Sequence, residues 1–134
     1  MTTKLNFKQI FIAGVMASIA SLVINAILFF VFHSTGVISD SVFVQPNQPL
    51  TITPVLMASI VPTLIAACVF FLFERFTNNG FKIFSIVAIV LLLLSIASPF
   101  MAIQGIALGY SIVLSIMHIV VVLSLLYSLK KAKN

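Results

Sequence analysis

Charged residues are scarce in this chain, and acidic residues are the scarcest. Among 134 residues there are two Asp or Glu and seven Lys or Arg, and charged residues make up 7% of the sequence. Soluble domains carry about 25% charged residues, so this composition does not suit a water-facing surface. Hydrophobic residues make up 62% of the chain, more than a soluble fold of this length could bury. Lipid is therefore the expected solvent for most side chains.

Cysteine and catalytic motifs are also nearly absent. Cys68 is the single cysteine, which excludes an intrachain disulfide and a CxxC redox pair. The sequence contains no HExxH, GxSxG, nucleotide-binding loop or paired aspartates. His33 and His118 differ in depth by about half the bilayer, so one chain could hardly bring both to a haem iron. We expect a protein that is not an enzyme and that holds no metal or cofactor.

Four long apolar runs are what the sequence does contain. They cover residues 10–32, 55–73, 83–103 and 108–129 approximately, and each is close to the roughly 20 residues that a helix needs to cross a bilayer core. Thr53 before Pro54 predicts a helix start at the second run, with a hydroxyl cap followed by a proline that needs no amide donor. The sequence predicts an all-α integral membrane four-helix bundle that forms a single domain over residues 1–134.

The basic residues all fall on one side of the alternating topology that four spans imply. The other two connections, 33–54 and the turn near 104–105, contain no Lys or Arg. The positive-inside rule then predicts that both termini and the connection at 74–82 are cytoplasmic. The net charge of +5 is accounted for at helix ends, so we expect no nucleic-acid partner. The basic residues are Lys4, Lys8, Arg75, Lys82, Lys130, Lys131 and Lys133.

The external loop at 33–54 is the one substantial segment outside the predicted spans. Its prolines favour extended backbone, and Val42, Phe43 and Val44 form an apolar segment that favours a strand. One interpretation is a lid on the outer rim of the bundle. The other is a binding loop in which Asp40 and Gln45, with neighbouring amides, contact a ligand.

Small and polar residues recur at helical spacing in every span. Residues three and four apart share a helix face, and small faces allow close helix packing in membranes. The simplest interpretation is therefore a bundle core. The faces are Gly14, Ser18, Ser21 and Asn25 in the first span, Ala58, Pro62 and Ala66 in the second, Ser85, Ala88, Leu92, Ser95 and Pro99 in the third, and Ser111, Ser115 and His118 in the fourth.

His118 and Asn25 are the strongest candidates for a functional role. His118 is about midway between Tyr110 and Tyr127, two residues that we interpret as interfacial anchors, so it should lie near the bilayer centre. A histidine at that depth suggests function, although it could also bond a neighbouring helix and stay neutral. We hypothesise a polar ligand pocket in the outer half of the bundle, under the external loop, built from Asn25, Ser95, Ser115 and His118.

The sequence also resembles a known family. The residues that carry the resemblance are Asn25, the segment 42–49, the Phe-x-x-Phe-Ser pattern at 81–85, and Met117-His118. Together they are similar to a family of small bacterial four-span proteins catalogued as a domain of unknown function. The resemblance implies a four-helix membrane fold and a bacterial plasma membrane, and it implies no activity.

Three functional hypotheses remain open. The first is a non-enzymatic binding or accessory protein, whose partners are membrane lipids, a small molecule, a second copy or another membrane protein. The second is an oligomeric transporter or channel, although no span contains the carboxylate that ion-coupled transporters usually need. The third is a membrane enzyme using His118 and Ser115, which lacks an acid to orient the histidine.

Overall fold

The structure is a computed structural model, and it describes residues 4–38, 43–45, 48–49, 51–101 and 108–133. Four helices dominate it, which confirms the all-α prediction. They are α1 (Phe7–Ser34), α2 (Ile52–Phe76), α3 (Gly80–Met101) and α4 (Leu108–Lys133). The predicted spans lie within these helices, except that the third was expected to reach residue 103, which lies outside the described residues.

All four helices are long and apolar enough to cross a membrane. Large hydrophobic side chains cover their outer faces, including Leu93 and Leu94 on α3, which are 63% and 66% exposed. Such a surface is stable in lipid and not in water. The fold therefore indicates a multi-pass membrane protein.

The helix starts follow local hydrogen bonding. At α1, Asn6 Oδ1 accepts from the Gln9 amide at 2.8 Å, and Gln9 Oε1 accepts from the Asn6 amide at 3.0 Å, which completes a capping box. The predicted start of α2 at Thr53 is wrong, because the helix begins at Ile52 with Thr51 in the cap position. Pro54 is tolerated inside the first turn because amides there have no intrahelical acceptor.

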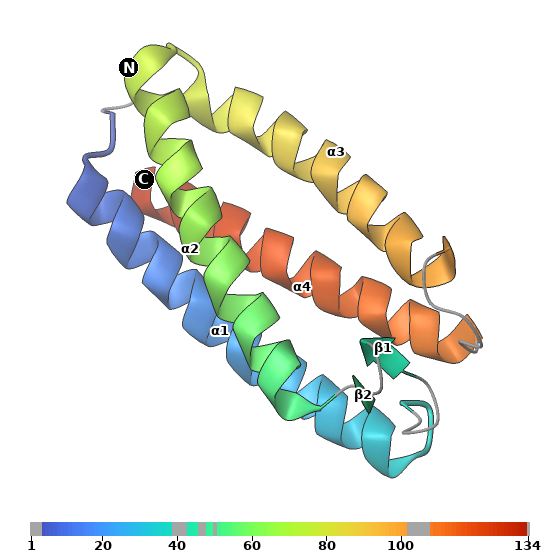
Figure 1. The fold of residues 1–134 in the computed structure, drawn as a ribbon. Helices are drawn as coiled ribbons and strands as arrows, with labels where there is room; N and C mark the ends of the chain where they lie inside the picture. The colour runs from blue at the N-terminus through green and yellow to red at the C-terminus, as the bar shows by residue number, and fades with distance from the viewer. Residues whose placement is uncertain (1–3, 39–42, 46–47, 50, 102–107, 134) are drawn as a thin grey trace.

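The helices pack in an open bundle in which α1 lies against α2 and α4, and α3 lies against α4 and one part of α2. Figure 1 shows both chain ends and the α2–α3 connection at one end of the bundle. We call this the basic end, because it carries the seven basic residues Lys4, Lys8, Arg75, Lys82, Lys130, Lys131 and Lys133. Glu74 lies at the same end. The α1–α2 connection lies at the opposite end.

The α1–α2 contact runs along small residues. The predicted α1 face is confirmed, because Gly14, Ser18, Ser21 and Asn25 are all buried. The predicted α2 face is wrong by one residue position. Ala58 and Pro62 are exposed, and the buried residues include Ser59, Thr63 and Ala67. Apolar Ala58 and Pro62 suit a lipid-facing position, whereas hydroxyl groups are less costly inside the bundle, where each bonds a carbonyl.

Aromatic residues hold α2 and α3 together near the basic end. The Phe70 and Phe84 rings meet edge to face with centroids 5.2 Å apart, and Phe73 also contacts Phe84. Leu125 of α4 joins this cluster. Only 11% of the apolar segment of α3 is buried, against 28% in each other helix. Helix α3 is therefore peripheral, and Figure 1 shows it diverging from α2 away from the basic end.

The connection between α1 and α2 contains a short hairpin. Strand β1 (Phe43–Gln45) pairs antiparallel with β2 (Gln48–Pro49). The predicted strand segment agrees at Phe43 and Val44, while Val42 lies outside the described residues. Figure 1 shows the hairpin at the end opposite the basic end, beside α1 and α4.

Candidate polar site around Asn25 and His118

Asn25 makes the hydrogen bonds that connect three helices. Its Nδ2 donates to Ser59 Oγ on α2 at 3.0 Å and to the Met117 carbonyl on α4 at 3.4 Å. Ser59 Oγ in turn donates to the Val55 carbonyl at 2.9 Å, so it can accept from Asn25. Asn25 is 2% exposed, and its Oδ1 has no hydrogen-bond partner among the described residues. The Nδ2 group of Asn25 therefore joins the helices, while its buried Oδ1 is an acceptor without a donor among the described residues.

The serines named from the sequence mostly bond within their own helices. Ser115 Oγ donates to the Ser111 carbonyl at 2.9 Å, and Ser95 Oγ donates to the Leu91 carbonyl at 2.8 Å. Ser115 is buried and Ser95 is half-buried. Hydroxyls bonded this way act as small packing groups.

His118 is an exposed residue on a face of α4 that is otherwise buried or half-buried. Ser111 and Leu125 are seven residues before and after it, and residues spaced by seven share a helix face. Ser111 is 1% exposed and Leu125 is 4% exposed, yet His118 between them is exposed. The prediction that His118 joins the buried face of Ser111 and Ser115 is therefore wrong.

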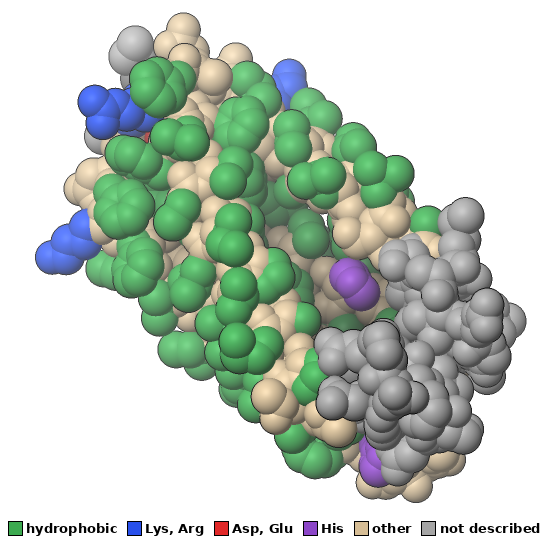
Figure 2. All heavy atoms as spheres, viewed as in Figure 1, with side chains coloured by type: hydrophobic (Ala, Val, Ile, Leu, Met, Phe, Trp, Pro, Cys, Tyr) green, Lys and Arg blue, Asp and Glu red, His purple; other side chains and the backbone are tan. Residues whose placement is uncertain are grey.

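The ring of His118 presents one free nitrogen. Its Nδ1 lies 2.6 Å from the Leu114 carbonyl oxygen. A carbonyl can only accept, so Nδ1 carries the hydrogen of this bond. No described residue bonds Nε2, so the neutral ring offers an acceptor lone pair there. Figure 2 shows a hollow on this face of the molecule, with a histidine side chain visible in it.

The structure places Asn25 against the turn of α4 that includes His118. Asn25 bonds the carbonyl of Met117, the residue before His118, so the two candidates adjoin one turn of α4 from different sides. Asp40 lies outside the described residues, as does the side chain of Gln45, whose backbone belongs to β1. A single pocket closed by the loop stays a prediction. Over the described ranges, no three His, Cys, Asp or Glu residues gather as metal ligands would.

Sequence reasoning missed three polar residues that the structure buries: Ser59, Thr63 and Glu74. The four-residue spacing of Ser59 and Thr63 was a usable signal, because it places both hydroxyls on one face. Thr63 Oγ1 bonds the Ser59 carbonyl at 2.8 Å, and Ser21 Oγ reaches the same carbonyl from α1 at 3.3 Å.

Glu74 lies near the C-terminal end of α2 and is 3% exposed. Its Oε2 accepts from the Leu5 amide at 3.2 Å and pairs with Lys133 Nζ at 2.5 Å. Lys4 Nζ also donates to the neighbouring Arg75 carbonyl at 3.4 Å. The end of α2 thus binds segments near both ends of the chain. Its signal in the sequence was weak: a single acidic residue beside a basic one.

Fold and site together define a small polytopic four-helix membrane protein with a polar centre. Residues 6–134 match the model of a family described as "Family of unknown function (DUF6069)", and the chain belongs to that family. The resemblance to a four-span family of unknown function is thereby confirmed. Neither a curated protein nor a solved structure matches the chain.

Proposed function

We propose that this protein is a non-enzymatic binding or accessory protein of the membrane. In this proposal the hollow at His118 takes a small, largely apolar molecule that carries one hydroxyl or N–H donor. The observation that carries the proposal is the free Nε2 of His118, exposed between buried Ser111 and Leu125. An unpaired acceptor at that depth costs free energy in hydrocarbon, and a donor on a bound molecule would remove that cost.

The surroundings of His118 support a pocket that is closed at one end and open at its side. Towards the basic end, Phe70, Phe84 and Leu125 fill the space between α2, α3 and α4. Towards the opposite end, α3 and α2 separate. An apolar molecule could therefore enter laterally from lipid. Asn25 fixes the adjoining turn of α4 through the Met117 carbonyl.

Hydrogen bonding around His118 supports binding rather than catalysis. A histidine base needs a nucleophile within reach and an acid that orients it. Ser115 Oγ is buried and donates to the Ser111 carbonyl. The bond that orients His118 is the one that its Nδ1–H donates to the Leu114 carbonyl, and a carbonyl stabilises a charged ring less than a carboxylate does.

The proposal includes an orientation. The seven basic residues share one end of the bundle, and the positive-inside rule assigns such an end to the cytoplasm of a bacterial plasma membrane. The hollow at His118 then belongs to the outer half of the membrane. The hairpin of β1 and β2 faces the outside.

Native mass spectrometry of protein purified in mild detergent tests the proposal. We expect a small apolar species to accompany the wild-type chain and to be lost from His118→Leu. His33→Leu is the matched control, because His33 is an exposed histidine at the end of α1 and stacks on Phe29 instead. Equal retention in wild type and His118→Leu, with both variants folded, would refute the assigned site.

A further inference from the structure

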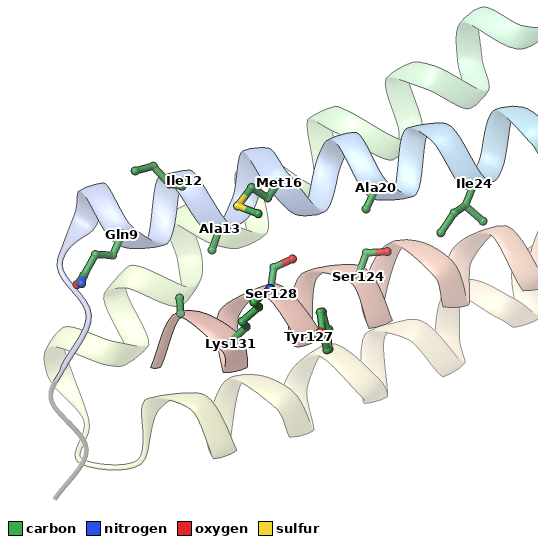
Figure 3. Close-up of a pocket in the computed structure, with 11 residues that line it drawn as sticks. Gln9, Ile12, Ala13, Met16, Ala20, Ile24, Ser124, Tyr127, Ser128 and Lys131 are labelled. Atoms are coloured by element: carbon green, nitrogen blue, oxygen red, sulfur yellow. The ribbon is translucent and has the colours of Figure 1, made fainter. Parts of the chain in front are cut away.

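A second candidate site lies on the opposite side of α4, at the level of the basic end. A groove of about 550 Å³ runs between α1 and α4. Its α1 wall extends from Gln9 to Ile24, and its α4 wall from Ser124 to Ala132. Figure 3 shows Met16, Ala20 and Ile24 facing the α4 wall. The groove does not include His118 or Asn25, so it is independent of the function proposed above.

Side-chain size explains why α1 and α4 leave space here. The floor is lined by small residues, Ala13 and Ala20 on α1 and Ser124 and Ser128 on α4. Larger side chains form the rims: Met16 is 57% exposed and Tyr127 is 67% exposed. Small residues between larger ones therefore leave a groove between the two helices that is open to the surrounding lipid.

Along α1, the groove is longer than one leaflet of the bilayer is deep. Gln9 and Ile24 are fifteen positions apart, which corresponds to about 22 Å along a helix. One leaflet of the hydrocarbon core is about 15 Å deep. An acyl chain that enters at the basic end can therefore fill the part of the groove nearest that end, while the groove continues past the middle of the bilayer.

The polar groups of the groove lie at its basic end. Lys131 and Gln9 line it there, near the interface where lipid phosphates lie. Glu74 is already paired with Lys133, and Lys131 has no ion-pair partner among the described residues. An unpaired lysine at the mouth of an apolar groove is complementary to an anionic headgroup.

We infer that the α1–α4 groove binds an anionic phospholipid from the leaflet at the basic end. One acyl chain lies against Ile12, Met16 and Ala20, and the phosphate contacts Lys131 with Gln9 as an additional donor. Basic pockets between membrane helices recognise lipid headgroups by the same chemistry. The bound lipid would fill the gap between α1 and α4.

The test adds dioleoyl phosphatidylglycerol or dioleoyl phosphatidylcholine to the purified full-length chain and measures retained lipid by native mass spectrometry. We expect selective retention of phosphatidylglycerol by the wild type. Lys131→Gln should retain it about fivefold less, from the loss of one lysine–phosphate attraction. Lys130→Gln is the matched control, because Lys130 is an adjacent exposed lysine that does not line the groove.

A second pair of variants tests the acyl chain. Ala20→Phe should fill the groove and reduce retention of both lipids, whereas Val23→Phe should not, because Val23 is exposed on α1 outside the groove. Thermal unfolding confirms that each variant is folded. Equal retention by Lys131→Gln and Lys130→Gln, or by Ala20→Phe and Val23→Phe, would overturn the inference. His118→Leu should retain phosphatidylglycerol as the wild type does, which separates this site from the hollow.

Discussion

Asn25 connects three helices through one amide group. Its Nδ2 reaches Ser59 on α2 and the Met117 carbonyl on α4. Hydrogen bonds between membrane helices contribute about 0.6 kcal/mol on average and up to roughly 1.7 kcal/mol. Asn25 makes two such bonds from a fully buried position, so it should lie in the upper part of that range.

Replacing Asn25 with Leu should therefore destabilise the folded protein by about 1.5 kcal/mol, because both bonds disappear and the Met117 carbonyl loses a donor. Unfolding by sodium dodecyl sulfate in mixed micelles measures the change. Ser95→Ala is the control and should stay near wild type, because Ser95 bonds its own helix. If both variants unfold alike, the bonds of Asn25 do not stabilise the bundle.

The α1–α2 pair depends on a close approach of two helices. A Cβ atom placed on Gly14 would lie 2.8 Å from Cβ of Ala67 on α2. Ala67 is 1% exposed, so neither helix has free space on that side. The small-residue face of α1 therefore sets the distance between these two helices.

Gly14→Ala should force the helices apart and cost about 1–3 kcal/mol, the usual range for overpacking. Ala67→Gly in the same chain removes the opposing Cβ and should restore most of the loss. Thermal unfolding in detergent measures both. Gly109→Ala is the control on α4, because its added Cβ would meet Val37 Cγ1 at an ordinary 3.6 Å. If Ala67→Gly does not restore the stability lost in Gly14→Ala, the contact between positions 14 and 67 does not set the distance between α1 and α2.

At the scale of the molecule, Glu74 joins the two terminal segments to the end of α2. It accepts from the Leu5 amide and pairs with Lys133. Removing one partner of a buried ion pair is usually costly, but Lys133 is 14% exposed and can turn towards water. The main consequence should therefore be local opening of the basic end.

Glu74→Ala should raise hydrogen exchange in residues 4–8 and 128–133 while the centre of the helices stays protected. Hydrogen-exchange mass spectrometry gives this map. Arg75→Ala is the adjacent control, because the exposed Arg75 side chain leaves both contacts of Glu74 intact. Unchanged exchange in the terminal segments of Glu74→Ala would contradict the role assigned to this carboxylate.

The orientation of the whole bundle is tested by cysteine labelling. With Cys68 replaced by Ser, Thr35→Cys should react with a membrane-impermeant maleimide in intact cells, because Thr35 is exposed at the end opposite the basic end. Lys130→Cys should react only after the membrane is opened. Labelling of Lys130→Cys in intact cells, or of both positions alike, would refute the cytoplasmic assignment of the basic end.

Local signals predicted the buried face of α1 and misplaced that of α2. The α1 face through Gly14 and Asn25 followed from spacing alone, because one row of that helix is small and polar. On α2 two adjacent rows are small, one through Ala58 and one through Ser59, and spacing cannot choose between them. The rotation of α2 was decided by contact with α1, where Ser59 bonds Asn25.

Hydropathy along the chain was sufficient to determine the four helices and the side on which the cations gather, because transfer to lipid acts on each segment separately. The exposure of His118, the burial of Glu74 and the groove between α1 and α4 were decided only in the tertiary structure. Leu5 and Glu74 are 69 residues apart, and Glu74 and Lys133 are 59 apart. Contacts of that range depend on how helices rotate and diverge as they pack, and no local pattern encodes that geometry.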